Sequence, residues 1–266
     1  MTERSFNTAD GVRIVYDDVG PRDGVPVVLC HGLAAAAEQF EADAAFFADA
    51  GFRVLVPDLR GHGRSATPQP LVPAALGIER FAADLTRMLD DAKVGKVHWV
   101  GNSLGGIAAL AMLRQDRFRT LTTFGTLYAI GLPRLGGHHA ITAGRAVLGQ
   151  RLFATLTANS TSPNPAARAV LKRVLSQTRY RVTAMLAGVL TRYDLTGEAS
   201  RATLPILMLR GGRDLAVNSG LGGTIAAMRG RPNFTLVELP LGGHCANLDV
   251  PETFRTTLLQ FWERHA

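Results

Sequence analysis

The sequence predicts an α/β protein with a mainly parallel central sheet, helices on both faces and an inserted helical cap. Short runs of Val, Ile and Leu alternate with helical patterns over residues 26–124, and the alternation returns over residues 206–262. Between these regions, residues 128–203 contain helical pieces without a strand pattern. Strands that alternate with helices run parallel, and helices then cover both faces of the sheet.

The N-terminal part supplies the first strands. Residues 13–16 and 26–30 are apolar and rich in β-branched side chains, and the turn-forming residues 20–24 separate them. This arrangement predicts an antiparallel start to the sheet. A further apolar strand is expected over residues 53–57, which the chain enters through Gly51.

The later elements follow from periodicity, because apolar residues recur at helical spacing in some segments and form short continuous runs in others. We expect strands at 97–101, 121–124, 206–209 and 234–239, and helices at 78–91, 104–113 and 251–262. The last helix begins with a proline, which is favourable at a first helical position.

The segment of residues 128–203 is too long for an ordinary loop. Asn164, which a proline follows, matches a helix N-cap, and residues 170–175 continue with an apolar stripe. We therefore expect a core domain of residues 1–127 and 204–266, with residues 128–203 inserted as a cap segment.

Composition and charge exclude several classes of protein. Hydrophobic residues make up 47% of the 266 residues and charged residues 19%, which excludes a disordered chain. The net charge of +7 raises nucleic acid or an acidic surface as partners. However, residues 131–201 alone carry +8, so the remainder of the chain carries −1. We expect no nucleic-acid partner, because the cap segment has few aromatic residues that could stack on bases.

The sequence also predicts where the protein resides. No run of about 18 apolar residues suggests a membrane span, and the N-terminus shows no apolar leader. The two cysteines of the chain are too few for a disulfide framework. We therefore expect a cytoplasmic protein.

The strongest chemical motif is the G-x-S-x-G pattern around Ser103, immediately after the strand 97–101 and at the start of a helix. In this context it predicts a nucleophile elbow, in which small glycines let the chain turn tightly and expose the hydroxyl. The start of the following helix offers free N–H groups and a favourable dipole for developing negative charge. An ordinary glycine-rich turn is the alternative interpretation.

A nucleophilic serine needs a base, and His244 is the best candidate among the seven histidines because it follows the last strand. Asp214, just past the strand 206–209, can orient the imidazole. Catalytic residues are therefore predicted to be Ser103, Asp214 and His244, in the order expected on this architecture. The backbone N–H groups of Leu33 and Leu104 are the candidate oxyanion donors.

Two further motifs are interpreted as structural. His31 follows a strand directly and is expected to brace its loop rather than act as a second base. In the run that begins at Asp58, this residue and Arg60 are expected to tie loops together by hydrogen bonds, and His62 is not expected to be catalytic.

Together these motifs resemble those of the α/β-hydrolases, in particular the small cap-bearing group of carboxylesterases, enol-lactone hydrolases, cofactor-free haloperoxidases and carbon–carbon bond hydrolases. The resemblance covers nearly the whole chain and rests on the H-G pair at His31, the D-L-R-G-H-G-R-S run at Asp58, the Ser103 elbow, Asp214 and His244. It does not specify a substrate. The proline that the family often has four residues after the acid is Asn218 here.

The predicted function is that of a serine hydrolase that cleaves a carboxylic ester or lactone through an acyl-enzyme, without a metal or other cofactor. Cleavage of a carbon–carbon bond in a vinylogous diketone acid is an alternative, since Asn102 before the serine also occurs in that subfamily. Hydrolysis of an ester or thioester on a carrier protein is another. A hydrolase-fold protein that binds a ligand with little catalysis represents a different class.

The cap segment is expected to determine substrate size. Its apolar candidates for lining the substrate site are Leu132, Leu148, Leu152, Phe153, Met185 and Leu186, which could equally pack between the cap helices. The positive charge of the segment is interpreted mainly as solvated helix faces. The alternative is attraction of an acidic partner, either an anionic acyl substrate or an acidic carrier protein.

Overall fold

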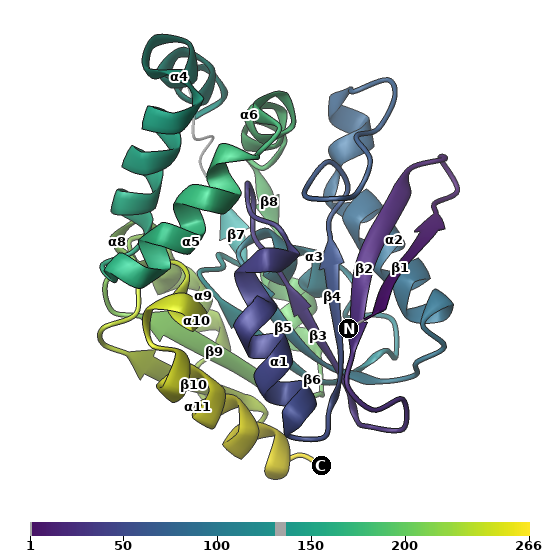
Figure 1. The fold of residues 1–266 in the computed structure, drawn as a ribbon. Coiled ribbons are helices and arrows are strands. Elements are labelled where there is room, and N and C mark those ends of the chain that lie inside the picture. The colour runs from purple at the N-terminus through teal and green to yellow at the C-terminus, as the bar shows by residue number, and fades with distance from the viewer. Residues whose placement is uncertain (1, 131–136) are drawn as a thin grey trace.

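The computed structural model describes residues 2–130 and 137–266 and has an eight-stranded sheet at its centre (Figure 1). The strands follow the spatial order β1-β2-β4-β3-β5-β6-β9-β10. Only β1 with β2 and β2 with β4 pair antiparallel, and the other neighbours are parallel. The strands are β1 (Thr2–Asn7), β2 (Arg13–Val19), β3 (Pro26–Cys30), β4 (Arg53–Asp58), β5 (Val97–Asn102), β6 (Phe118–Phe124), β9 (Ile206–Gly211) and β10 (Phe234–Leu239). The predicted fold class is confirmed.

Helices cover both faces of the sheet, because the central strands are apolar on both sides. On β3, Val28 packs in one cluster with α2 (Ile78–Asp91) and α3 (Leu104–Ala111). Val27 points to the other face and packs with α1 (Glu41–Asp49) and α11 (Pro251–Glu263). Successive strand residues point to opposite faces, so one short strand contributes to both cores. The remaining core elements are α8 (Leu215–Asn218), α9 (Leu221–Met228), α10 (Ala246–Asp249) and the short 3-10 helices Ala37–Phe40 and Pro73–Leu76.

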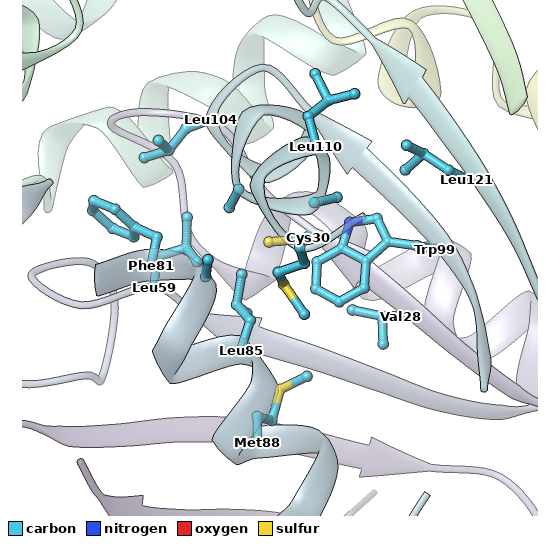
Figure 2. Packing of buried hydrophobic residues seen from close by; sticks show 14 of the residues in the cluster. Val28, Cys30, Leu59, Phe81, Leu85, Met88, Trp99, Leu104, Leu110 and Leu121 are labelled. Atoms are coloured by element: carbon cyan, nitrogen blue, oxygen red, sulfur yellow. The ribbon is translucent and has the colours of Figure 1, made fainter. Parts of the chain in front are cut away.

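Figure 2 shows the first of these clusters from close by. Trp99 of β5 lies below α3, with Val28 and Cys30 of β3 beside it and Met88 of α2 nearby. All four side chains are fully buried, and burial of a large apolar side chain stabilises a fold by about 1.5–3 kcal/mol. This packing fixes the carboxyl ends of β3 and β5, at which the candidate site lies.

The chain between β6 and β9 forms a separate group of helices above the carboxyl edge of the sheet (Figure 1). They are α4 (Gly137–Thr161), kinked at Gly149, α5 (Pro165–Ser176), α6 (Tyr180–Val189) and α7 (Thr196–Arg201). The predicted N-cap is confirmed, since the Asn164 side chain accepts a hydrogen bond from the N–H of Ala166 at 2.9 Å.

One detail of the cap segment differs from the prediction, which expected helices only. β7 (Ala129–Ile130) and β8 (Tyr193–Asp194) pair antiparallel and join the two ends of the segment. Strands of two residues are too short to produce an alternating pattern in a sequence. None of the helices in the described parts of the chain is long and apolar enough to cross a membrane.

Candidate active site

The turn between β5 and α3 holds Ser103 in an unusual backbone conformation, with φ 47° and ψ −111°. Glycines on either side make this turn possible. A Cβ on Gly101 would lie 2.5 Å from the backbone nitrogen of Gly106, and one on Gly105 would lie 2.3 Å from the carbonyl oxygen of Cys30. Positive φ at a residue other than glycine is costly and is found preferentially at functional sites. The serine therefore lies on a strained, closely packed elbow, as the motif predicts.

His244 lies in the loop after β10 and is paired with Asp214 at the end of β9. The distance between His244 Nδ1 and Asp214 Oδ2 is 2.8 Å. Because a carboxylate only accepts, Nδ1 carries the hydrogen, and Nε2 of the neutral ring keeps its lone pair. The other oxygen of Asp214 accepts from the N–H of Val217 at the start of α8. The carboxylate is thus fixed by its own helix and by the imidazole.

The loop of His244 is attached to the strand that carries Ser103. The side chain of Asn102 donates hydrogen bonds to the carbonyl oxygens of His244, at 3.0 Å, and of Phe124, at 3.2 Å. Gly125 lies between the same groups, since a Cβ there would be 2.9 Å from Asn102 Nδ2 and 3.0 Å from His244 Cε1. The residue next to Ser103 therefore holds the main chain of His244.

Asn102 is itself one end of a buried chain of amides that the sequence did not reveal. Gln39 Nε2 donates to the side-chain oxygens of Asn102, at 3.1 Å, and Asn247, at 3.2 Å. Asn247 donates in turn to Asp43, which also binds Arg255. Each of the three amide side chains is 1% exposed, so these hydrogen bonds form away from water and are expensive to break.

A second set of contacts attaches the cap segment to the same loop. The carboxylate of Asp249 accepts from the N–H of Gly243 at 2.7 Å and from the hydroxyl of Ser162, which follows α4. The N–H of His244 donates to the carbonyl oxygen of Thr161 at 3.3 Å. The histidine loop is thus held from below by Asn102 and from above by the end of α4.

The two candidate oxyanion donors lie beside the serine elbow. Leu104 is the first residue of α3, and an N–H in that position has no intrahelical acceptor. Leu33 follows Gly32, at which a Cβ would lie 3.1 Å from the Cβ of Ser103. The loop after β3 is therefore packed against the serine.

The structural interpretation of the two histidines agrees with their contacts. His31 is fully buried, with Nδ1 donating to Gly32 O at 2.7 Å and Nε2 accepting from the N–H of Leu59 at 3.1 Å. Burial also lowers the pKa of His31, so its ring is neutral. His62 packs at 5.3 Å against His31, measured between ring centroids. Among the described residues, neither ring forms a hydrogen bond with the serine elbow.

The charged residues of the run that begins at Asp58 tie loops together. Asp58 accepts from the N–H of Ala37 at 2.8 Å and from the guanidinium of Arg64 at 2.7 Å. Arg60 is 1% exposed and binds the carboxylates of Asp84 and Asp10. These bonds agree with the architectural role predicted for Asp58 and Arg60.

Burial determines the chemistry of the two cysteines. Cys30 and Cys245 are both buried, and burial raises the pKa of each thiol, so neither is a reactive thiolate. Within the residues that the structure describes, no group of three or more His, Cys, Asp or Glu side chains could hold a metal ion.

The apolar residues expected to line a substrate site differ in exposure. Leu148 and Leu152 of α4 are 38% and 48% exposed, Phe153 and Met185 are half-buried, and Leu186 is fully buried in the core. Leu186 belongs to the main core cluster rather than to contacts between the cap helices alone, and Leu132 lies outside the described residues. Their role toward a substrate remains a prediction.

Comparisons with known proteins agree with this architecture. The chain is 40% identical over 103 residues to a non-heme chloroperoxidase of Streptomyces lividans, a match that spans 38% of this chain and 36% of the relative. The esterase RhEst1 from Rhodococcus sp. ECU1013 superimposes with a TM-score of 0.85 at 23% identity, covering 100% of both chains. The enol-lactonase from Burkholderia xenovorans LB400 gives 0.80 at 23% identity, covering 98% of this chain and 100% of that one. At such identities the two structures show a shared fold.

A family model described as the alpha/beta hydrolase fold matches residues 25–251, which include the Ser103 elbow, Asp214 and His244. This match spans most of the chain. The protein therefore belongs to the alpha/beta hydrolase fold family.

Proposed function

We propose that the protein is a serine hydrolase that cleaves a carboxylic ester or lactone through a covalent acyl-enzyme. The observation that carries this proposal is the 2.8 Å hydrogen bond between His244 Nδ1 and Asp214, together with the strained backbone of Ser103. The bond leaves Nε2 of the imidazole free to accept a proton. An exposed hydroxyl and a correctly oriented base are the two requirements of nucleophilic catalysis by serine.

In the first step, His244 accepts the proton of the Ser103 hydroxyl while the oxygen attacks the substrate carbonyl. The N–H groups of Leu33 and Leu104 stabilise the oxyanion, and the dipole of α3 adds to their effect. The protonated imidazole, stabilised by Asp214, then gives its proton to the leaving alcohol. In the second step, His244 activates a water molecule that hydrolyses the acyl-enzyme and frees Ser103.

We further propose that residues 128–203 act as a cap that selects the substrate above Ser103. Leu148, Leu152 and Phe153 of α4 supply apolar surface for an acyl chain in this proposal. The excess positive charge of this part of the chain favours an anionic acyl substrate or an acidic carrier protein. In that case kcat/KM should fall steeply with added salt, because salt screens such attraction.

The test is turnover of p-nitrophenyl esters and labelling by a fluorophosphonate probe. Ser103→Ala should abolish both while the circular dichroism spectrum stays unchanged. Ser219→Ala is the matched control, because Ser219 is an exposed serine whose hydroxyl donates, within the described part of the chain, to Ala216 O alone. Retained turnover in Ser103→Ala would exclude Ser103 as the nucleophile. A panel of esters, lactones and a dienoic ring-cleavage acid then separates ester hydrolysis from carbon–carbon bond cleavage.

A further inference from the structure

A cavity of about 780 Å³ is lined in part by Ala35 and Ala36 of the loop after β3. Its walls come from β2, the loop after β3, α1, the loop after β4 and the turn between α5 and α6. Neither Ser103 nor His244 lines it. Small-molecule sites occupy roughly 300–1,000 Å³, so this volume suits an organic ligand.

The inner wall of the cavity is apolar and made of small side chains. Five of the eight apolar side chains that line the cavity are alanines, which leave room for a ligand. The eight are Val19, Ala35, Ala36, Ala37, Ala44, Ala45, Val56 and Val174. Such a wall accepts a flexible apolar chain.

The turn between α5 and α6 forms a fixed wall of this cavity. Thr178 Oγ1 donates to the carbonyl oxygen of Ala34 at 2.9 Å, and Arg179 Nη1 donates to Ser65 O at 2.8 Å. These two bonds join the cap segment to the loops after β3 and β4. A ligand would therefore meet a wall that is already in place, which reduces the entropic cost of binding.

The carboxylates that line the cavity already have cationic partners. Asp17 accepts both Nη groups of Arg64, at 2.7 and 2.8 Å, and Asp58 accepts its Nε at 2.7 Å. Glu38 is paired with Arg173 at 3.3 Å, and Glu41 lies 4.0 Å from the same guanidinium. Both glutamates are substantially exposed, which puts them at the mouth, where solvent screens their charge.

Arg179 differs from the other two arginines because it has no carboxylate partner in the described chain. Its one hydrogen bond there goes to the carbonyl oxygen of Ser65, so Nε and Nη2 remain available as donors. A guanidinium with two free donors matches the geometry of a carboxylate.

His62 lines the same cavity as a neutral ring. Its Nδ1 lies 3.0 Å from Arg60 O and carries the hydrogen, and burial lowers the pKa of His62 to about 3. The ring therefore adds no positive charge, which leaves Arg179 as the cation of the lining without a carboxylate partner in the described chain.

We propose that this cavity binds a carboxylate with an apolar chain, in which Arg179 holds the carboxylate and the alanine wall holds the chain. A carboxylate is also the product that hydrolysis of an ester releases. The site is nevertheless independent of the proposed reaction, because it shares no residue with the proposed catalytic group.

The test is binding of decanoate, measured by calorimetry on the Ser103→Ala chain so that no turnover interferes. Ala45 is exposed on α1 and lines the cavity, so Ala45→Phe fills the space without disturbing the core. Ala42→Phe, at an exposed position of α1 outside the cavity, is its matched control. Arg179→Gln removes the free guanidinium, and Arg181→Gln is the control at an exposed arginine that does not line the cavity.

We expect Ala45→Phe and Arg179→Gln each to raise Kd at least ten-fold, while both controls stay within two-fold. Decylamine should bind more weakly than decanoate. Absence of binding, or equal Kd values in all four variants, would overturn the site. Tighter binding of decylamine would overturn the ligand class, because Glu38 and Glu41 would then determine the preference. Ester turnover of the parent chain is measured separately, so failure of either proposal leaves the other standing.

Discussion

Replacement of Asn102 by alanine should separate the positioning of the histidine loop from the general stability of the fold. The substitution removes two donated hydrogen bonds, to Phe124 O and His244 O, and the bond accepted from Gln39, besides a long, weak one from Cys245 Sγ at 3.9 Å. A buried hydrogen bond contributes about 1 kcal/mol, so the free energy of unfolding should fall by about 3 kcal/mol. Because His244 also loses its attachment to the serine strand, kcat should fall about 100-fold, the effect of a displacement near 1 Å.

The assay is ester turnover at saturating substrate together with urea denaturation of the same preparation. Asn233→Ala is the matched control, since the Asn233 side chain also donates to two carbonyl oxygens, Ala202 O at 2.9 Å and Leu204 O at 2.7 Å, but lies away from the proposed catalytic group. It should lower stability by about 2 kcal/mol and leave kcat unchanged. If Asn102→Ala keeps kcat within two-fold of the parent, the amide does not position His244 and the reasoning fails.

Three further substitutions test the carboxylate that pairs with His244, a buried ion pair and the pH dependence of stability. Asp214→Asn should lower kcat about 10⁴-fold in the ester assay with the fold intact, because the imidazole loses its orienting charge, and a fall below ten-fold would contradict the assignment. Arg60→Met leaves the buried carboxylate of Asp84 without its cationic partner and should lower the free energy of unfolding, measured in urea, by about 3–5 kcal/mol. No change would show that the ion pair is dispensable. Burial lowers the pKa of His98 to about 4. As the pH drops, His98 is therefore protonated in the unfolded chain before it is protonated in the folded one. The free energy of unfolding should fall by about 3 kcal/mol between about pH 6.5 and pH 4. His98→Asn should flatten this fall in urea titrations at pH 7 and pH 4.5, and an unchanged slope would assign the effect elsewhere.

Elements with strong periodicity were predictable from the sequence, and elements without it were not. The helix α2 and the strand β10 have the predicted bounds, since each shows a clear apolar pattern. In contrast, β1 has one buried residue, Phe6, among six, so its pairing with β2 depends on backbone hydrogen bonds that leave no trace in composition. Helix α1 was missed because it carries two adjacent phenylalanines, Phe46 and Phe47, of which the first is 37% exposed and only the second is buried, so that no clear apolar stripe forms.

The same distinction holds for the candidate site. Ser103, Asp214 and His244 could be proposed because each follows a strand, and parallel strands bring their carboxyl ends to one edge. The amides that hold the histidine loop could not, since Gln39 and Asn247 lie 208 residues apart and buried polar residues follow no period. Gln39 and Asn247 meet only because the folded sheet brings the segments that follow β3 and β10 together.

The bonds between Asp249, Ser162 and the main chain of Gly243 also affect how this fold can diversify. Exchange of residues 128–203 between relatives looks modular, because both ends meet in the β7–β8 pair. Yet Ser162 belongs to the exchanged piece, while its acceptor, Asp249, belongs to the part that stays. A chimaera made for a new specificity therefore needs a hydroxyl retained at position 162. Without that hydroxyl, a new cap segment that changes the ligand would also loosen the loop that carries His244.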